Sequence, residues 1–360
     1  MNNPLGVAVV GIGPQQWSNV AHLPAINATD GVELVRLVTS TPESAQRAQS
    51  TWNVPAGHEL QQALDDEAVD IVTVTVRVAR HAEIASAAIA AGKHLYCEWP
   101  LGIDADQARE LAALSDAHPG KVHLVGLQGR LSPALREAAD VIADGTIGRP
   151  VAASVQVFVS QSLHPRPLHR AHLRHRSASA NVLSIQGGHT LDMLLALLGD
   201  PGPVHSARVW TAIDEFTVLE TGEKLPRDAP DNVAALLEVG GIPVTAQFSQ
   251  TSARSFSTIE ILGTEGSLLI EAPDQPQMSP LTVIVRKLDG TPVPLPTEVP
   301  AVGGGLDPSH PGFNVALAYR HLVDAVTGAR SVAALPTFHR AVTMHDFVDA
   351  IDARARTPLG

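Results

Sequence analysis

The first 130 residues alternate between short apolar runs and longer stretches with a helical pattern. Apolar runs of strand length cover residues 7–12, 32–38, 69–76, 94–98 and 122–127. Most are continuous and rich in β-branched residues, which is typical of strands buried on both faces. Helix-like stretches lie between them at about 42–52, 80–91 and 104–117. Strands that alternate with helices in this way predict a parallel sheet built from right-handed βαβ units.

Local residue types mark the ends of these expected helices. Thr41 precedes Pro42, a pairing typical of an N-cap followed by proline at the first helical position. Asp104 offers a second N-cap, and Gly92 suits the left-handed residue that closes a helix. Hydrophobic period and capping chemistry therefore agree on where these helices begin and end.

After residue 145 the pattern changes to strands of alternating hydrophobicity. A turn at 146–150 leads into residues 151–159, which alternate like a half-exposed strand. Later strands are expected at 204–212, 231–238, 243–250, 256–262, 267–271 and 281–287. Short turns such as 240–241 and 263–266 join most of them, which indicates a mainly antiparallel sheet.

The end of the chain returns to helical patterns. A loop rich in proline and glycine at 296–312 precedes two expected helices, at about 313–327 and 337–353. The fold class is thus α/β followed by α+β. Residues 1–128 form a Rossmann domain, and residues 129–360 form a mainly antiparallel sheet domain with helices. We expect the last helix to pack back on the first domain.

Composition narrows the classes of function. Apolar residues make up 44% of the chain and charged residues 17%, as in a globular protein. The net charge of −12 argues against a nucleic-acid binder, which needs basic surface. No apolar run approaches the roughly 20 residues that span a membrane. Residues 1–5 lack the features of a signal peptide, and Cys97 has no cysteine partner in the chain, so we expect a cytoplasmic protein.

The first strand runs into a glycine turn that contains Gly11 and Gly13. Glycines at this junction allow a tight turn and let a pyrophosphate approach backbone N–H groups at a helix N-terminus. The third glycine of the usual fingerprint is absent, so the motif alone also fits an ordinary strand-to-helix turn. Its position at the first βα junction favours dinucleotide binding.

Several segments together carry a resemblance to a known family. They are the glycine turn, 22–26, 81–83, 91–101, 128–130, 187–192 and 263–266. In this order and spacing the chain resembles the Gfo/Idh/MocA family of NAD(P)-dependent oxidoreductases over nearly its full length. The resemblance implies a Rossmann domain followed by an open-faced sheet domain. It also implies activity on sugars, cyclitols or related polyols, and a homo-oligomer assembled through the sheet.

Three departures from the family pattern bear on catalysis. Trp99 stands where family enzymes usually have a lysine that assists proton transfer, and tryptophan cannot exchange a proton at neutral pH. Ile185 stands where many members have an aspartate four residues before the catalytic histidine. The glycine turn is three residues longer than usual. The longer turn and Glu98-Trp99-Pro100 resemble the Gal80-like branch, whose fungal member binds a dinucleotide but works as a regulator.

Strand ends and the resemblance together suggest the cofactor contacts. The expected residues are Gly11, Gly13, Gln15, Trp17, Ser40, Thr41, Val76, His81, Glu98 and Trp99. NAD-binding sites normally place an acidic residue after the second strand, and residues 38–41 contain none. Small hydroxyl side chains there leave room for a 2′-phosphate, although Arg47 lies several residues down the helix. The cofactor is therefore NADP or NAD, with NADP slightly favoured.

The segment around His189 is the expected centre of the chemistry. His189 begins a helix whose leucines form an apolar stripe, and Asp192 lies three residues on, which places both on one face away from the centre of that stripe. A histidine is suited to act as general acid or base on a carbinol, and it carries the catalytic assignment. The alternative is a buried, hydrogen-bonded histidine that holds the start of the helix.

Other expected substrate contacts are Trp99, Asp192, Arg130 and His169. Trp99 either stacks on a ring of the ligand or packs after its strand. Arg130 either faces a ligand or forms an interdomain salt bridge. His169 belongs to residues 164–176, which contain four histidines and four arginines. That stretch is either a solvated basic loop or a flap that attracts an anionic or polyhydroxylated ligand; a metal site is disfavoured because arginines oppose a cation.

Two hypotheses of function remain open. The first is an oxidoreductase that moves a hydride between a nicotinamide and a sugar-like alcohol or ketone, with His189 at the reacting oxygen. The second is an NAD(P)-binding sensor that acts through a protein partner without turnover. His189 and Asp192 favour the enzyme, whereas Trp99 and Ile185 favour the sensor. The residues lean toward the enzyme.

Overall fold

The computed structural model describes residues 3–13, 15–295 and 305–356. The chain forms two compact units. The first contains Met1–Gln128 and Ala301–Thr343, and the second contains Gly129–Pro300 and Met344–Gly360. Each unit therefore joins segments that lie far apart in the sequence.

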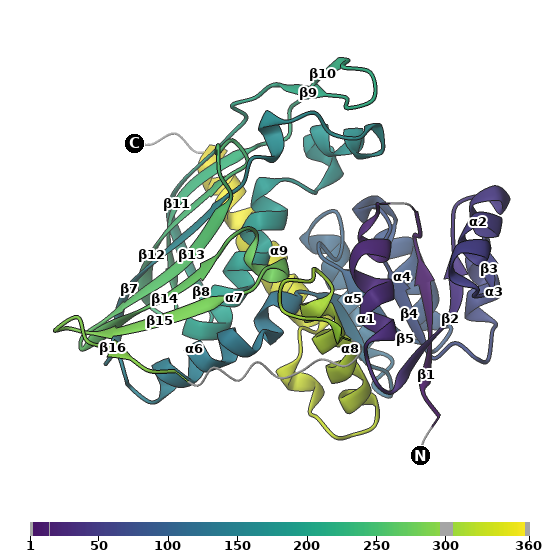
Figure 1. Ribbon diagram of the computed structural model, residues 1–360, viewed down its shortest axis with the longest axis horizontal. Coiled ribbons are helices and arrows are strands. Elements are labelled where there is room, and N and C mark those ends of the chain that lie inside the picture. Colours follow the sequence, from purple (N-terminus) through teal and green to yellow (C-terminus); the bar gives the residue numbers. More distant parts are fainter. Residues whose placement is uncertain (1–2, 14, 296–304, 357–360) are drawn as a thin grey trace. The chain divides into compact units, whose positions relative to one another are not determined.

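The first unit is built on a parallel sheet of six strands (Figure 1). The strands are β1 (Leu5–Val10), β2 (Val32–Val38), β3 (Ala56–Gly57), β4 (Ile71–Val74), β5 (His94–Glu98) and β6 (His123–Gly126). They lie in the order β3-β2-β1-β4-β5-β6, and every neighbouring pair is parallel. The expected Rossmann sheet is confirmed. The short edge strand β3 is an addition that sequence patterning does not predict.

Helices accompany this sheet, and all of them except the short helices α1 and α3 are predicted from the sequence. They are α1 (Leu23–Asn27), α2 (Pro42–Trp52), α3 (Leu60–Leu64), α4 (His81–Ala90), α5 (Ala105–Asp116) and α8 (Phe313–Val326), together with the first residues of α9 (Phe338–Arg356). Thr41 and Asp104 cap α2 and α5 as expected, because their side chains accept from the backbone N–H groups of Ser44 and Gln107. Gly92 follows α4 with φ +67°.

The strand order reverses between β1 and β4. In open α/β sheets, ligands bind outside the carboxyl ends of the strands at such a reversal. The ends of β1, β4 and β5 therefore define where the dinucleotide site of this unit is expected.

Residues from the C-terminal part of the chain complete the first unit. Helix α8 packs against α1. The backbone N–H of Val125, in β6, donates to the carbonyl of Pro336 over 2.8 Å, and Thr337 forms a bridge with Leu124. The Rossmann sheet is thus extended at its β6 edge by residues that are more than 200 positions distant in sequence.

The second unit is built on an eight-stranded sheet. Its strands are β7 (Pro150–Phe158), β8 (Pro201–Trp210), β11 (Asn232–Val239), β12 (Ile242–Ser249), β13 (Phe256–Gly263), β14 (Gly266–Ala272), β15 (Thr282–Lys287) and β16 (Pro292–Val293). They lie in the order β16-β15-β14-β13-β7-β12-β11-β8. All neighbouring pairs are antiparallel except β7 and β12, which confirms the expectation of a mainly antiparallel sheet.

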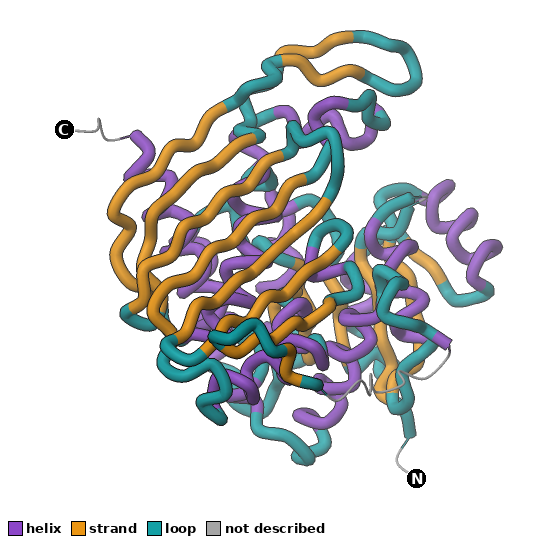
Figure 2. The backbone as a smooth tube through the Cα atoms, turned by 60° about the vertical axis from the view of Figure 1, so that its left-hand side comes forward, coloured by secondary structure: helices purple, strands orange, loops and turns teal. Residues whose placement is uncertain are grey.

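Helices cover one face of this sheet. They are α6 (Pro133–Ala143), α7 (Gly188–Leu198) and the part of α9 from Met344 onward (Figure 1). Among the described residues no helix lies on the opposite face, which Figure 2 shows as a broad open surface. Helix α6 is not among the helices predicted from the sequence. Its buried residues Leu135, Ala138 and Val141 repeat at helical spacing, so the signal was present.

A small hairpin interrupts the connection from β8 to β11. It consists of β9 (Glu215–Thr217) and β10 (Lys224–Pro226), and sequence patterning does not predict it. Most of its residues are exposed, so hydrophobic alternation gives no signal there. The predicted turn at 263–266 is confirmed as the β13–β14 hairpin. Of the predicted loop 296–312, residues 296–304 lie outside the described residues, and 306–312 form turns and loop.

Candidate functional site

The first strand ends in a turn that accepts only glycine at its first position. Gly11 has φ +105°, and a Cβ atom there would lie 2.9 Å from backbone atoms of Thr75 and Val76, which follow β4. The hydroxyl of Thr75 donates to the carbonyl of Val10 over 2.9 Å, and that of Ser18 donates to the carbonyl of Gly11 over 2.9 Å. The glycine turn is therefore fixed against the end of β4, at the reversal of strand order.

The extra length of this turn is taken up by a π-helical segment, Ser18–His22, which leads directly into α1. π-Helical turns often occur at functional sites. Gln15 has φ +58° and is exposed. The indole N–H of Trp17 is buried and has no hydrogen-bond partner in the described part of the chain. A buried donor of this kind is suited to a ligand acceptor, and contact of Trp17 with the cofactor stays a prediction.

The end of β2 presents hydroxyl groups and no carboxylate. The Thr41 hydroxyl accepts from the backbone N–H of Ser44, so the N-cap of α2 occupies it. Ser40 is exposed, as is Arg47 one turn into α2. Glu43, also exposed, is the acidic residue in the first turn of α2. The residues expected to face the adenosine ribose are thus small and neutral.

His81 ties two of these strand ends together. Its Nδ1 lies 2.8 Å from the carbonyl of Pro100, and its Nε2 lies 2.9 Å from the carbonyl of Val76. Burial lowers the pKa of His81, against the opposing effects of these two carbonyls and of Glu98. Both ring nitrogens face backbone carbonyls, and the N–H of the neutral ring donates to one of them. In this structure His81 therefore positions Val76 and Pro100.

Glu98, at the end of β5, belongs to a hydrogen-bonded chain. Its carboxylate lies 3.0 Å from His22 Nε2, and His22 Nδ1 lies 2.9 Å from the hydroxyl of Tyr319. The same hydroxyl lies 2.8 Å from the hydroxyl of Thr73, in β4. Gly126 makes room for the carboxylate, because a Cβ there would lie 2.7 Å from it. Helix α8 thus supplies the group that orients His22, and His22 orients Glu98.

Trp99 follows Glu98 and is 4% exposed, so nearly all of its indole packs against protein. The peptide bond between Trp99 and Pro100 is cis. The burial matches the packed alternative for Trp99, and contact with a ligand stays a prediction. No side chain able to exchange a proton occupies the position of the usual lysine.

In the second unit, a second π-helical segment, Val182–Gly187, leads directly into α7. His189, in the first turn of α7, is 6% exposed. Burial lowers the pKa of His189 to about 3, so the imidazole is neutral near pH 7. Its Nδ1 is buried and has no hydrogen-bond partner among the described residues. A hydrogen-bonded structural histidine, the alternative for His189, would need a partner at Nδ1, and the described residues supply none.

Asp192 pairs with Arg130 within the same unit, with 3.1 Å between Oδ1 and Nη1. Arg130 therefore makes an ion pair inside the second unit, which neither of its two expected roles describes. The face that His189 and Asp192 share is buried as well. Helix α7 is buried on almost every side, and Asp192 is 1% exposed.

A row of buried glutamines, which sequence reasoning missed, lies beside this helix. Gln186 Nε2 donates to Gln275 Oε1 over 3.1 Å, and Gln250 Nε2 donates to Gln186 Oε1 over 3.2 Å. Gln186 precedes His189 by three residues at the start of α7. The three glutamines come from different parts of the sequence, so no spacing signal could have grouped them. We call Gln186, Gln250 and Gln275 the glutamine row.

The glutamine row ends at a guanidinium. Arg227 Nη2 donates to Gln250 Oε1 over 2.9 Å, and Nη1 donates to the hydroxyl of Ser162 over 2.5 Å. Burial lowers the pKa of Arg227, against the effect of Asp231. Burial also lowers the pKa of Arg166 to about 10, helped by the neighbouring charges of Arg170 and Arg227.

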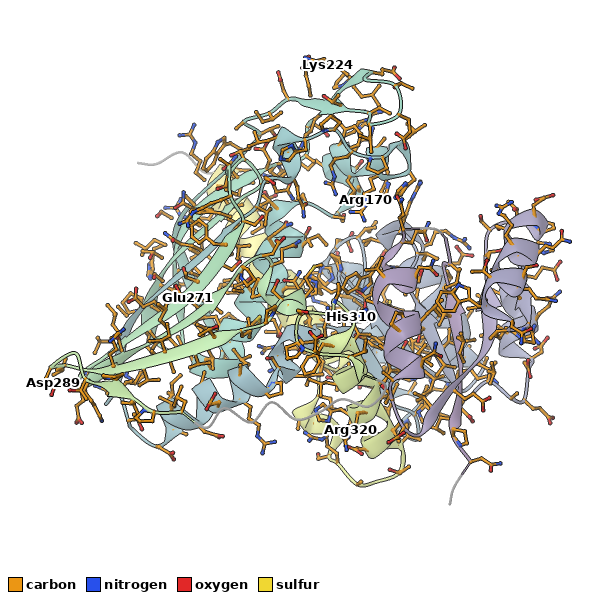
Figure 3. The ribbon with its side chains drawn as sticks, in the orientation of Figure 1. Arg170, Lys224, Glu271, Asp289, His310 and Arg320 are labelled. Atoms are coloured by element: carbon orange, nitrogen blue, oxygen red, sulfur yellow. The ribbon has the colours of Figure 1, made fainter. Side chains whose placement is uncertain are left out.

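Residues 164–176 pack on the β9–β10 hairpin, and residues 164–165 and 168–169 among them are exposed, so the solvated-loop and flap alternatives both stay predictions. A 3₁₀ helix covers Leu168–Arg174, and Arg166 forms a bridge with Val218 beside β9. The backbone N–H of Leu168 donates to Glu220 over 2.9 Å. Figure 3 labels Arg170 on this helix and Lys224 on the hairpin. His169 is exposed, and its role toward substrate stays a prediction.

Neither a metal cluster nor a membrane span occurs within the described ranges. No group of three or more His, Cys, Asp or Glu side chains there could hold a metal ion. None of the helices in those ranges combines the length and apolar character needed to cross a bilayer.

Two family models match the chain. The model described as "Oxidoreductase family, NAD-binding Rossmann fold" matches residues 5–126, and the model described as "GFO/IDH/MocA C-terminal domain" matches residues 135–269. Together they cover both the Rossmann sheet and most of the open-faced sheet. The two domains that the resemblance implies are thus matched in the expected order.

Known relatives include both enzymes and regulators. Dehydrogenase aclE of Aspergillus oryzae is 30% identical over 285 residues, which cover 75% of this chain and 76% of that protein. The galactose/lactose metabolism regulatory protein GAL80 of Kluyveromyces lactis is 26% identical over 293 residues, which cover 75% of this chain and 64% of that protein. Similarity to both enzymes and a regulator agrees with residues 98–100, where Trp99 replaces the lysine of family enzymes and the tripeptide resembles the Gal80-like branch.

A solved structure with the same fold contains both kinds of ligand that the resemblance implies. Levoglucosan dehydrogenase in complex with NADH and L-sorbose is 25% identical, with a TM-score of 0.79 over 98% of this chain and 96% of that chain. The two units described above therefore occur together in an enzyme that holds a reduced dinucleotide and a sugar.

Proposed function

Because the chain belongs to the Gfo/Idh/MocA family, we propose that it transfers a hydride between a nicotinamide dinucleotide and a sugar-like alcohol or ketone. The observation that carries this proposal is the state of His189. Its ring is buried, and its Nδ1 has no partner among the described residues. A buried polar atom without a partner costs about 1–3 kcal/mol, so its retention favours a ligand that supplies the missing hydrogen bond.

The first unit offers a site that fits the dinucleotide. Gly11, with φ +105°, turns the chain tightly against Thr75 and Val76 at the end of β1, which is where a Rossmann domain receives the pyrophosphate. Gly11, Gly13, Trp17, Ser40 and Glu98 are the residues that would hold the cofactor. When bound, the cofactor supplies the hydride acceptor or donor. The protein supplies binding, orientation and a dry environment.

The ionisation of His189 limits what it can do. With a pKa of about 3, the imidazole is neutral at working pH and a weak base. A neutral imidazole still hydrogen-bonds to the oxygen of an alcohol or carbonyl and so fixes the carbon that exchanges the hydride. We propose that His189 is a catalytic residue mainly through this contact.

The cofactor choice follows from the end of β2. No carboxylate at residues 38–41 is available to accept from a ribose 2′-hydroxyl, which favours NADP(H). Glu43 in the first turn of α2 opposes a 2′-phosphate by its charge, and this makes the preference small. NAD(H) is the alternative, and the levoglucosan dehydrogenase complex contains NADH.

A silent sensor is the second candidate function, favoured by Trp99. The usual lysine is absent there, and a relative with this architecture, GAL80, is a regulatory protein. A sensor would bind the dinucleotide and transmit its presence to a protein partner. His189 would then serve recognition rather than turnover.

We also propose that the open face of the large sheet packs against a second copy of the chain. The face carries small and apolar side chains, including Ala234, Leu236 and Thr245, around a shallow hollow of about 430 Å³. Leu236 is 40% exposed. Exposed apolar surface of this kind often marks a protein interface.

A titration followed by a turnover assay separates the two functions. NADH and NADPH are titrated against the purified protein by fluorescence, and reduced-nicotinamide absorbance is then followed against a panel of sugars and polyols. Binding with substrate-dependent turnover supports the enzyme and selects the cofactor. Binding without turnover supports the sensor, and no binding of either dinucleotide contradicts both.

A further inference from the structure

Three arginines gather in the second unit, and the charge of one of them, Arg227, is partly offset by Asp231. Arg166 and Arg170 come from the segment on the β9–β10 hairpin, and Arg227 comes from the residues after β10. Arg170 and Arg227 act on Arg166 through their charge, and no acidic group raises the pKa of Arg166. We call these residues the arginine cluster. It stands in a chain whose net charge is −12.

The hydrogen bonds of the cluster go to neutral groups or are absent. Arg227 donates to the carbonyl of Ala229, to Ser162 and to Gln250. The side chains of Arg166 and Arg170 make no hydrogen bond or ion pair within the described residues. Arg166 is nevertheless half-buried. A guanidinium held away from water and without a partner lacks the compensation that buried charges normally have.

Other arginines of the same segment show what a structural role looks like. Arg176 pairs with Asp352, and Arg174 donates to the carbonyl of Pro226. Those two side chains hold the segment to its surroundings. The side chains of Arg166 and Arg170 make no such contact among the described residues. Their guanidinium groups therefore do not stabilise the fold through hydrogen bonds or ion pairs. An anion is the ligand that would offset both their mutual repulsion and their desolvation.

The cluster is connected to the proposed reacting group. Gln250, at one end of the glutamine row, bonds to Arg227 and to Gln186, and Gln186 lies one helical turn before His189. Glutamine amides both donate and accept, so they suit the hydroxyl groups of a sugar. Hydrogen-bonded polar side chains thus run from the positive charge of Arg227 to Gln186, three residues before His189.

We propose that the substrate is an anionic sugar derivative whose carboxylate or phosphate binds Arg166 and Arg227. Its hydroxyls would contact the glutamine row, and its reacting carbon would lie at His189. Arginine suits this role because its planar fork matches two oxygens of a carboxylate or phosphate. Arg170 adds charge at the same place. The inference rests on the proposed function for the statement that the bound ligand is a substrate.

The test is equilibrium binding, measured by titration calorimetry, which does not require turnover. Wild-type protein and the variant Arg166→Gln are titrated with D-glucuronate, inorganic phosphate and neutral D-glucose. We expect both anions to bind the wild type at least about tenfold tighter than the variant, since a hydrogen bond to a charged group is worth about a factor of ten or more. The affinity for D-glucose should be equal in the two proteins. Tighter binding of glucuronate would assign a sugar acid, and tighter binding of phosphate a phosphorylated sugar.

Matched variants distinguish anion binding at a specific site from a general effect of the protein's positive charges. Arg208→Gln removes the same charge from β8, where the side chain stacks over Trp210 at 5.3 Å. It should bind the anions as the wild type does. Arg166→Lys keeps the charge but loses the fork, and should fall between wild type and Arg166→Gln. Equal anion affinity in wild type and Arg166→Gln would overturn the proposal, as would an equal loss in Arg208→Gln.

Stability distinguishes a ligand site from a structural one. Because the Arg166 guanidinium makes no hydrogen bond within the described residues, the melting temperature of ligand-free Arg166→Gln should equal or exceed that of the wild type. A lower melting temperature would indicate a structural role and contradict the proposal.

Failure of the inference and failure of the proposed function give different results. Turnover of neutral sugars that is unchanged in Arg166→Gln would leave the oxidoreductase standing and remove the anionic substrate. Arg166-dependent anion binding without turnover of any sugar acid or sugar phosphate would leave the site standing and remove the oxidoreductase.

Discussion

At the scale of single residues, His189 is the side chain whose surroundings depend most on a ligand. It is almost fully buried, it is neutral near pH 7, and its Nδ1 has no partner in the described structure. A histidine needed only for packing would be expected to donate or accept at both nitrogens. Its environment therefore suits a contact that forms only when a substrate is present.

Replacement of His189 by alanine should lower kcat by about 10²–10³, the range found when a side chain that hydrogen-bonds to the reacting oxygen is removed. The affinity for the reduced dinucleotide should stay within about twofold of wild type, because the expected cofactor contacts lie in other residues. Steady-state kinetics and fluorescence titration measure the two quantities. His205→Ala, a change at an exposed histidine, serves as control. Unchanged turnover in His189→Ala would remove His189 from the mechanism.

The two tyrosines of the chain offer a matched comparison. The Tyr319 hydroxyl is shared by His22 and Thr73, whereas the buried Tyr96 hydroxyl has no hydrogen-bond partner within the described residues. Tyr319→Phe should lower the free energy of unfolding by about 1–3 kcal/mol, because it leaves two buried polar groups unpaired. Tyr96→Phe should be neutral or stabilising. Urea denaturation checks both, and equal effects would contradict the hydrogen-bonded chain.

Sequence reasoning reached some of these residues and missed others for a physical reason. Gly11, Glu98 and His189 lie in local motifs, so their neighbours along the chain identify them. Tyr319 orients His22 from 297 positions away. Nothing in the sequence around either residue signals the contact. Residues that act through distant partners are therefore the part of a site that a single sequence does not show.

At the scale of elements, the glycine turn after β1 shows how local conformation prepares a binding site. Gly11 has a positive φ, and a Cβ there would meet backbone atoms at 2.9 Å, whereas the atoms nearest a Cβ at Gly13 belong to the flexible side chain of Gln16. Gly11 is required because the backbone atoms next to it cannot move away from a Cβ. A Cβ at position 13 would meet only the side chain of Gln16, which can move.

Gly11→Ala should therefore weaken dinucleotide binding more than Gly13→Ala does. The first change forces a strained φ and a backbone clash, which together cost about 1–3 kcal/mol, or roughly a factor of 5–150 in affinity if the turn moves. Fluorescence titration of both variants with the preferred dinucleotide measures the ratio. A larger loss in Gly13→Ala would mean that the close approach at Gly11 is not used by the cofactor.

The elements that the sequence predicts are those with a strong hydrophobic period or a cap. The strands of both sheets other than the short edge strands β3 and β16, together with helices α2, α4 and α5, belong to this group. The β9–β10 hairpin and the 3₁₀ helix Leu168–Arg174 do not, because most residues of the hairpin are exposed and no residue of the 3₁₀ helix is buried. The arginine cluster lies on and beside these two elements, so its composition was visible in the sequence while its arrangement was not.

At the scale of the whole molecule, buried histidines make stability depend on pH. Burial lowers the pKa values of His94 and His123 to about 4 and that of His189 to about 3. The geometry agrees at His94, whose Nδ1 accepts from the backbone N–H of Val122 over 3.0 Å and so must be unprotonated. In the unfolded chain each of these histidines titrates near pH 6.5.

Acidification should therefore destabilise the protein at pH values well above those at which carboxylates become protonated. Between pH 6.5 and about 4 the unfolded chain binds protons that the folded chain does not, so stability falls as pH falls. Each histidine contributes on the order of 3 kcal/mol over that range. Urea midpoints at pH 7, 5.5 and 4.5 measure the trend. The slope should be shallower in His94→Asn, and an unchanged slope would contradict the assigned pKa of His94.

The open sheet face should determine the oligomeric state. Leu236→Glu places a charge in the centre of that face and should convert the oligomer to monomer in size-exclusion chromatography with light scattering. Leu219→Glu makes the same change on the turn between β9 and β10, where Leu219 is 58% exposed, and should have no effect. An oligomer that survives Leu236→Glu would place the interface elsewhere.

The composition of the first unit has a consequence for how the chain is made. Its sheet is finished by residue 126, yet α8 and the 336–337 bridge arrive only after the whole of the large sheet has been synthesised. At about 5–20 residues per second, roughly 10–40 s separate Gln128 from Tyr319 at the ribosome. Throughout that interval His22 and Thr73 lack the hydroxyl that they share in the finished protein. The large sheet is in effect an insertion into the nucleotide-binding unit. The part of that unit that is synthesised first therefore stays incomplete until the last part of the chain has been made.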